Sequence, residues 1–324
     1  DEDFGGKSPQ SMDSRFPRGM QIAVTERICE LVAAFYQYDF SATKHLRLVG
    51  SVPGSHAGDG GCKWGLGRLS SIVASATAMH HPDKARPWCG QCSGMRQGSS
   101  SGSTAPWGPL RLGGNVSSIG SMRRDECYLH EFATSMGCSD VHKRGGLDIY
   151  WPSVECVRTY SMGYAAGGSI CADPKNIFTD KHTCQRLLRG LHGVLRKWKS
   201  TDEPGKTRYG KMEGNRVPTT PHIKTFFQRC EHNMARWLYA GSHNLSAAAW
   251  GIKTKQNKLS MWSWELGVLL LPTETTPVHL PLCLPYCLDT QHFPEDHQGV
   301  GDDEPWSWST RVRAFPDAYG RVGV

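Results

Sequence analysis

Short apolar runs of strand length, separated by segments with helical periodicity, are the feature of this sequence that most constrains its fold. Leu46–Val49 and Leu147–Trp151 are mostly apolar runs bounded by turn residues, as in strands that are buried on both faces. Met20–Tyr38 and Leu66–Met79 instead carry apolar residues at helical spacing. Strands that alternate with helices predict the α/β class, with a mixed sheet and helices on both of its faces.

Further segments extend this pattern, and two stretches interrupt it. The other predicted elements are a helix at Leu187–Trp198 and strands at Asn115–Ile119, His222–Phe227, Trp237–Ala240 and Trp264–Leu271. A stretch rich in Gly, Pro and Ser at about 80–109 indicates a flexible insertion, and from residue 273 the chain is an irregular, Pro-rich tail. We expect one domain over residues 1–324.

Charge and cysteine content narrow the possible partners. Lys and Arg outnumber Asp and Glu by 37 to 30, a formal net charge of +7, which suits a polyanion such as DNA. The 12 cysteines are scattered without regular spacing, so we expect reduced thiols in an intracellular protein. The most apolar stretch, Leu266–Pro272, is shorter than a membrane span, so no membrane partner is expected. Because the first residue is Asp1 rather than Met, we expect a fragment or a processed chain.

The spacing of cysteine and histidine residues predicts no metal site. Cys89 and Cys92 have the spacing of a zinc knuckle. A structural zinc ion needs two further ligands at suitable spacing, and neither a second such pair nor paired histidines follow nearby. No cofactor is expected either.

The strongest chemical signal is the triplet His222-Ile223-Lys224. On a strand, an imidazole and an ammonium group two residues apart leave the same face and can contact one phosphate, although such a triplet also arises by chance. Roughly twenty residues later, Gly241–Gly251 (GSHNLSAAAWG) runs from a strand end into a helix start. Its amides and the side chains of Asn244 and Ser246 suit an anion, although alone it could be an ordinary capped helix.

Together, these two segments resemble the second catalytic motif of tyrosyl-DNA phosphodiesterases, a family of the phospholipase D superfamily, in which HxK is followed at this distance by SxNLSxxAWG. Trp264–Pro272 (WELGVLLLP) is similar to the family's ELGVLFLP strand. Other similar segments are GSVPG at 50–54, NVSSIG at 115–120, YWPSVECVR at 150–158, GYAAGGS at 163–169, and PWSW at 305–308 followed by Pro316, Asp317 and Gly320. The resemblance implies a phospholipase D-like α/β/α sandwich, the C-terminal half of a two-domain enzyme.

The resemblance implies a phosphodiesterase that clears 3′-phosphotyrosyl and related adducts, such as stalled topoisomerase I peptides, from DNA 3′ ends. One histidine attacks phosphorus to form a phosphohistidine, and a second protonates the leaving oxygen. By resemblance His222 is this second histidine, and Lys224 and Asn244 hold the non-bridging oxygens. Glu265 would accept a hydrogen bond from an imidazole, often that of the other half. His222-Ile223-Lys224 is the only HxK triplet here, so the motif with the attacking histidine is absent and we expect the isolated chain to be inactive.

The resemblance also implies contacts with substrate. Its candidates for gripping DNA phosphates are Ser51, Ser169, Ser246 and the backbone of Ala248. Turn and cap chemistry accounts equally well for Ser51 and Ser169. Trp308 matches a family position on the peptide side of the substrate groove, although a lone aromatic residue is more often part of the core. Lys175 and the basic linker at 199–220 would add nonspecific attraction to DNA.

Two other functions stay open on the sequence alone. One is a catalytically silent DNA-end-binding module that has lost its first motif, and the other is a phospholipase D-type hydrolase acting on lipid headgroups. An upstream HxK with Asn in the parent gene would distinguish the silent module from the enzyme. The family implies a nuclear location and a full-length enzyme that is monomeric. The implied partners are DNA 3′ ends and topoisomerase I-derived peptide.

Overall fold

The chain forms two compact units, Asp1–Lys44 and His45–Val324, a division that the sequence analysis did not anticipate. The computed structural model describes residues 18–43, 45–80, 111–121, 127–138, 146–182, 184, 186–201, 206–207, 210–211, 221–229, 234–271, 280–281, 284–296, 304–308, 315–317 and 319–322. From residue 81 onward, the predicted insertion at about 80–109 lies outside these ranges. So do residues 272–279 of the predicted irregular tail.

The first unit contains the helix α1 (Arg18–Phe35), which confirms the helix predicted over Met20–Tyr38. A single 3₁₀ turn, Ser41–Thr43, follows it. The apolar side chains of Leu31 and Phe35 on α1 are exposed. Across the described residues, no helix combines the length and the apolar character that crossing a bilayer requires.

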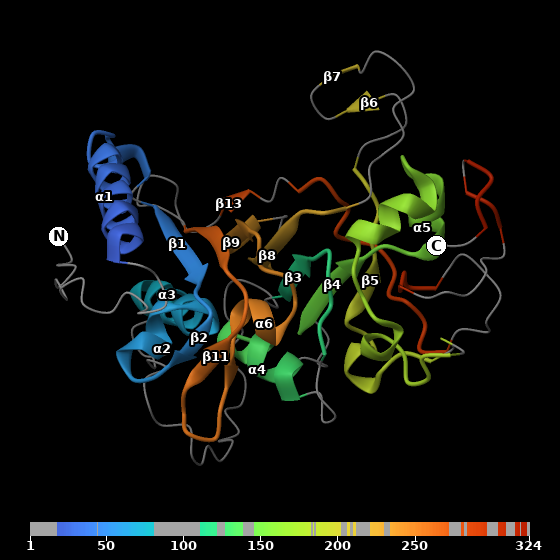
Figure 1. Cartoon of the computed structure of the whole chain (residues 1–324). Coiled ribbons are helices and arrows are strands. Elements are labelled where there is room, and N and C mark those ends of the chain that lie inside the picture. The colour runs from blue at the N-terminus through green and yellow to red at the C-terminus, as the bar shows by residue number, and fades with distance from the viewer. Residues whose placement is uncertain are drawn as a thin grey trace, which may run out of the picture. The chain divides into compact units, whose positions relative to one another are not determined.

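The second unit is built on an eight-stranded mixed sheet (Figure 1). Its strands are β1 (Leu46–Ser51), β3 (Arg111–Asn115), β4 (Leu147–Trp151), β5 (Leu195–Lys197), β8 (Lys224–Arg229), β9 (Met234–Gly241), β12 (Glu265–Leu270) and β13 (Leu280–Pro281). They follow the order β1-β12-β9-β8-β3-β4-β5, and β13 pairs with β9. Neighbours are antiparallel from β1 through β3 and parallel from β3 to β5. The mixed sheet of the predicted fold class is confirmed.

Smaller elements surround this sheet. β2 (Gly54–His56), β10 (Ile252–Lys253) and β11 (Leu259–Met261) form a three-stranded sheet, and β6 (Lys206–Thr207) pairs with β7 (Gly210–Lys211). The helices of this unit are α2 (Asp59–Lys63), α3 (Gly65–His80), α4 (Cys127–Ser135), α5 (Val154–Thr159) and α6 (Ala247–Trp250). Three further 3₁₀ helices lie at Gly163–Ser169, Pro174–Asn176 and Arg189–Leu191.

Successive side chains of β8 enter hydrophobic clusters on opposite faces of the sheet, because side chains alternate between the two faces along a strand. Phe226 packs edge-to-face against Phe132 of α4 and Trp250 of α6, with ring centroids 5.2 and 5.5 Å away. Phe227 lies instead in a second cluster with Tyr286, to which α5 also contributes. One face of the sheet is therefore covered by helices, and the other by α5 and the irregular chain around Tyr286.

Most predicted elements are confirmed, with ends shifted by a few residues. The helix predicted at Leu66–Met79 is α3, and five predicted strands are β1, β4, β8, β9 and β12. The strand predicted at Asn115–Ile119 is wrong in position, because β3 ends at Asn115 and only Ser118 and Ile119 of the remaining residues make isolated bridges.

The helix predicted over Leu187–Trp198 is wrong. The segment contains a 3₁₀ turn and then β5, which pairs in parallel with β4. Gly193, with φ +67°, lies between the two, and this left-handed conformation interrupts any helix. Pairing with the sheet therefore outweighed the apolar periodicity of the segment.

Candidate active site

The His222-Ile223-Lys224 motif lies at the start of β8. Lys224 is the first residue of the strand and is 7% exposed, whereas His222 precedes the strand and is exposed. The ammonium group of Lys224 donates to the carbonyl oxygen of His222 at 2.8 Å, and it lies 3.2 Å from Nδ1 and 3.4 Å from Nε2 of the imidazole. The charged end of a buried lysine is thus held against the ring of the histidine.

Burial disfavours the protonated forms of both groups. It is the main cause that lowers the pKa of His222, and the charge of Lys224 lowers that pKa further. Burial also lowers the pKa of Lys224, while the nearby Glu265 and Cys171 act to raise it. Both effects favour the neutral imidazole. A phosphate bound between the two groups would shift both equilibria back toward the protonated forms.

Asn115 and Ser117, at the end of β3 and just beyond it, connect the two motif segments. The Asn115 amide donates to the carbonyl oxygen of Ile223. Ser117 donates to Oδ1 of Asn244 through its backbone N–H, at 3.0 Å, and through its hydroxyl, at 3.3 Å. These bonds fix the orientation of the Asn244 amide, because only its oxygen can accept. Within the described residues Nδ2 of Asn244 has no protein partner, so it can donate to an anion.

Glu265 opens β12, where its backbone lies opposite Ser51 of β1. Burial raises the pKa of the Glu265 carboxyl, while a hydrogen bond from Ser242 and the charge of Lys224 act in the opposite direction. The charges of Glu265 and Lys224 therefore interact. Both ring nitrogens of His222 lie near the ammonium group of Lys224, at 3.2 and 3.4 Å, and which imidazole Glu265 serves stays a prediction.

His243, to which the sequence analysis gave no role, is completely buried inside this region. Its Nε2 lies 2.9 Å from the hydroxyl of Ser51, and its Nδ1 is hydrogen-bonded to the hydroxyl of Tyr239. Because the Ser51 hydroxyl donates to the carbonyl oxygen of Ala249, the serine must accept from His243, which places the imidazole proton on Nε2. The ring packs 4.1 Å from that of Trp250. Burial lowers the pKa of His243 to about 3.

Three residues predicted to contact DNA make bonds within the protein. Ser51 is 1% exposed and belongs to the His243 network, so its placement does not favour contact with a DNA phosphate. The hydroxyl of Ser246 caps α6 by accepting from the N–H of Ala249 at 3.2 Å. The carbonyl of Ala248 accepts from the backbone amides of residues 262 and 263, both at 3.0 Å.

The other predicted contacts lie on the surface. Ser169 is exposed and donates to a carbonyl of its own turn at 2.8 Å. Lys175 forms an exposed ion pair with Asp173 at 2.8 Å, which offsets part of its charge. Trp308 is 56% exposed and therefore not a core residue, and its backbone N–H donates to Ala172 at 2.8 Å. The neighbouring Cys171 acts on the pKa of Lys224, so this segment borders the motif.

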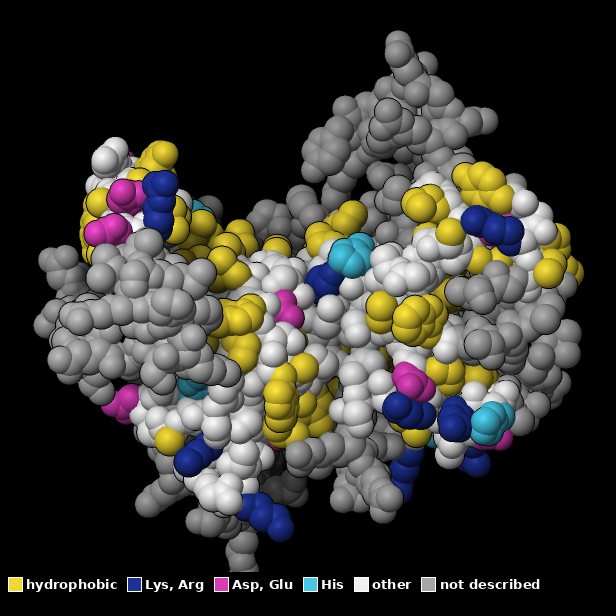
Figure 2. Space-filling view, in the orientation of Figure 1, with side chains coloured by type: hydrophobic (Ala, Val, Ile, Leu, Met, Phe, Trp, Pro, Cys, Tyr) yellow, Lys and Arg dark blue, Asp and Glu magenta, His cyan; other side chains and the backbone are white. Residues whose placement is uncertain are grey.

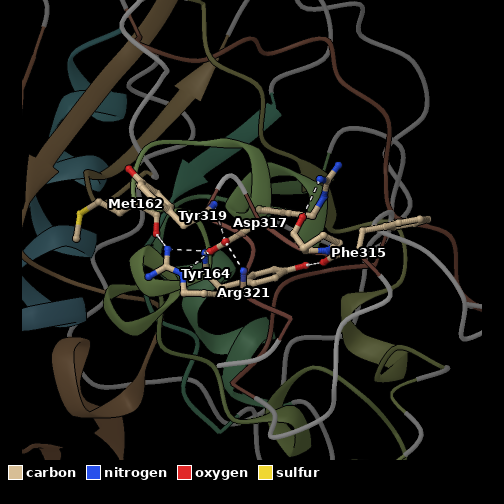
Figure 3. Close-up of polar contacts among 8 residues, drawn as sticks. Met162, Tyr164, Phe315, Asp317, Tyr319 and Arg321 are labelled. Atoms are coloured by element: carbon tan, nitrogen blue, oxygen red, sulfur yellow. Dashed lines mark hydrogen bonds and ion pairs between the residues drawn. The ribbon is translucent and has the colours of Figure 1, made fainter.

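The 3₁₀ segment Gly163–Ser169 is held by the C-terminal tail (Figure 3). Asp317, whose side chain is fully buried, accepts from the backbone N–H of Tyr164 at 2.9 Å and from the guanidinium of Arg321 at 2.8 Å. Tyr164 donates its hydroxyl to the carbonyl of Phe315 at 2.8 Å. Burial alone would raise the pKa of Asp317, but these bonds outweigh it and lower the pKa to about 2.

The pairing of β8 with β9 places Lys224 opposite Gly241, three residues before Asn244. Figure 2 shows one face of the molecule, on which a histidine, a basic and an acidic side chain lie close together near the middle, with hydrophobic side chains around them. An imidazole, an ammonium group and an oriented amide, contributed by His222, Lys224 and Asn244, can bind a tetrahedral anion and move one proton.

Comparisons with known proteins identify the family. A model of the Tyrosyl-DNA phosphodiesterase family matches residues 21–304. Tyrosyl-DNA phosphodiesterase 1 of Arabidopsis thaliana is 32% identical over 264 residues, which cover 80% of this chain and 35% of that protein. The probable tyrosyl-DNA phosphodiesterase of Schizosaccharomyces pombe is 28% identical over 253 residues, covering 75% of this chain and 40% of that protein.

Solved structures support the same fold. A crystal structure of the yeast tyrosyl-DNA phosphodiesterase aligns with a TM-score of 0.52 at 17% identity, covering 83% of this chain and 58% of that one. This likeness shows the phospholipase D fold. The chain spans less than half the length of the two curated relatives. Since the family model matches residues 21–304, this protein belongs to the tyrosyl-DNA phosphodiesterase family.

Proposed function

We propose that this chain is the acid–base half of a DNA-repair phosphodiesterase that hydrolyses 3′-phosphotyrosyl and related adducts at DNA 3′ ends. The observation that carries the proposal is the ammonium group of Lys224, which is buried and held 3.2 Å from the ring of His222. The oriented amide of Asn244 supplies a further donor from the second motif segment. The names of the relatives support a tyrosyl-DNA substrate.

In the first step of the proposed reaction, a histidine outside this chain attacks phosphorus, and the bond from phosphorus to the tyrosine oxygen breaks. His222 gives its proton to that oxygen, which leaves as a neutral phenol. In the second step a water molecule attacks the phosphohistidine, and His222 takes a proton from it as the phosphorus–nitrogen bond breaks. Imidazole suits both steps because its ordinary pKa of about 6.5 lies near neutral pH.

The cationic and amide groups stabilise charge on the phosphoryl oxygens. Lys224 and Asn244 are fixed by the fold before the substrate arrives, so little reorganisation accompanies the reaction. The phosphate also favours the protonated form of His222, which opposes the lowering of its pKa by burial and by Lys224. Substrate binding therefore favours the protonated imidazole that acts as the acid in the first step.

The partners and location follow from this chemistry. DNA 3′ ends and a topoisomerase I-derived peptide are the proposed substrates, and the nucleus is the proposed location. Among the residues with substrate roles, Ser169, Ser246, Trp308 and Lys175 remain proposed contacts. The active full-length enzyme is proposed to be a monomer.

The test is a labelled oligonucleotide with a 3′-phosphotyrosyl end, incubated with this chain mixed with the first half of a full-length relative. Turnover is expected from the mixture and is expected to disappear in His222→Ala. The Arg186→Ala variant is the control, since its ion pair with Glu295 lies on the surface and the residue has no proposed substrate role. Equal turnover by the mixture with and without His222 would refute the assignment.

A catalytically silent DNA-end-binding module is the second candidate. The observation that favours it is that His222-Ile223-Lys224 is the only HxK triplet among the 324 residues. A silent module would bind a 3′-phosphate strand but would gain no hydrolytic activity from any added first half. The mixing experiment therefore distinguishes the two functions.

A further inference from the structure

Two tryptophans are exposed at the bend between β11 and β12. Trp262 and Trp264 have exposed fractions of 63% and 75%, although indoles are normally mostly buried. The backbone beneath them is fixed, because the N–H groups of Trp262 and Ser263 both donate to the carbonyl of Ala248 at 3.0 Å. Large apolar side chains held in solvent on an ordered bend indicate a binding surface.

This surface continues onto the start of β12. Leu266, two residues beyond Trp264, is 61% exposed. A Cβ at Gly50 would lie 3.7 Å from Trp64 and 3.8 Å from Leu266, so these two side chains flank the same glycine.

The exposed bend adjoins the proposed catalytic groups. Trp264 immediately precedes Glu265, whose charge acts on the pKa of Lys224. Ala248, which anchors the bend, lies in α6 directly after the Asn244 segment. The bend that carries the indoles therefore leads directly into the strand that begins with Glu265.

We propose that Trp262 and Trp264 form a stacking platform for the unpaired nucleobases that precede the scissile phosphate on a single DNA strand. This inference rests on the proposed function, because it takes the His222 and Lys224 site to bind the 3′ phosphate. Every nucleobase has an aromatic face that can stack on an indole, so binding to the platform does not depend on the DNA sequence. It adds affinity for the bases, whereas Lys224 and the net charge of +7 act on the phosphates.

Unpaired DNA fits this surface better than a protein partner. A protein interface would also bury the aliphatic Leu266, because burial of any apolar area stabilises an interface. Base stacking depends on the indoles and tolerates another aromatic ring. The two partners therefore make different predictions for Trp→Phe and Leu266→Ala variants.

The experiment measures fluorescence anisotropy of this chain with two labelled single-stranded oligodeoxynucleotides that carry a 3′-phosphate. One strand has ordinary bases, and the other lacks the bases of its last few nucleotides. Wild-type chain is expected to bind the ordinary strand about tenfold more tightly. Trp262→Ala and Trp264→Ala are each expected to lose most of this preference and to leave the affinity for the abasic strand unchanged.

The control variants separate base stacking from general apolar contact and from self-association. Trp264→Phe is expected to retain the preference, and Leu266→Ala is expected to match the wild type. Equal loss of affinity for both strands in Trp262→Ala and Trp264→Ala would overturn the proposal. A change in the sedimentation coefficient of the chain in these variants, with no effect on strand preference, would assign the surface to self-association and also overturn it. Binding is read without hydrolysis, so failure of the catalytic proposal gives a separate result.

Discussion

Acidification from about pH 7 to about pH 5 is expected to destabilise this protein through His243. Its imidazole is fully buried, and its pKa of about 3 lies below the ordinary value of about 6.5 that it has in the unfolded chain. A histidine whose pKa is lowered on folding contributes its full stabilisation at pH values above its pKa in the unfolded chain. That stabilisation is lost as the pH falls toward its pKa in the folded chain.

The magnitude follows from the two pKa values. Between pH 6.5 and 3, His243 is protonated in the unfolded chain and neutral in the folded chain. The free energy of unfolding therefore falls by about 1.4 kcal/mol for each pH unit of acidification. At pH 5 the free energy of unfolding is therefore lower by about 2 kcal/mol. The acidic groups with lowered pKa values, such as Asp317, titrate below this window and do not obscure it.

Urea unfolding followed by tryptophan fluorescence at both pH values measures the effect. The reference is His243→Asn, which cannot titrate, and its own loss between the two pH values is subtracted from that of the wild type. His222→Asn is the matched control, because His222 also has a lowered pKa but is exposed. If wild type and His243→Asn lose the same stability on acidification, the buried neutral imidazole is refuted.

The remaining predictions concern chemistry and packing. Activity reconstituted with a first half should survive EDTA, because the proposed steps use histidines rather than a Lewis acid, and loss on chelation that Mg²⁺ restores would contradict the mechanism. The chain alone should not turn over a 3′-phosphotyrosyl strand, and turnover that rises with the square of protein concentration would instead indicate a homodimeric enzyme. Lys224→Met should lower kcat of the reconstituted enzyme by roughly 10²-fold or more. Asp317→Asn should lower the free energy of unfolding by about 2 kcal/mol, as measured by urea unfolding. Gly167→Ala should destabilise by about 1–3 kcal/mol, because its Cβ would lie 2.0 Å from the Trp306 ring, and unchanged stability would show that the ring can move.

Local pattern was sufficient to predict the elements that carry the motifs. The strand predicted at His222–Phe227 became β8, which begins at Lys224, and the apolar run after Trp264 became β12. The periodicity over Leu187–Trp198 failed, because parallel pairing with β4 and the conformation of Gly193 decided that segment. Pairing between distant strands leaves no signal in a local window.

The supporting residues of the site were harder to predict for the same reason. Asn115 and Ser117 connect the motif segments across more than one hundred residues of sequence, so only the sheet order brings them there. His243 could have been noted as an imidazole beside the motif residue Asn244. Its depth and its bond to Ser51 depend on the pairing of β1 with β12.

The anchor at Asp317 has a consequence for where this protein can be shortened. The family match ends at residue 304, and a chain that stopped there would keep His222, Lys224, Asn244 and Glu265. It would also lose the carboxylate that holds the N–H of Tyr164 and the carbonyl that receives its hydroxyl. Those bonds fix the turn that ends at Ser169, beside Cys171 and the motif lysine. The boundary drawn by sequence similarity is therefore shorter than the boundary required for an intact substrate face.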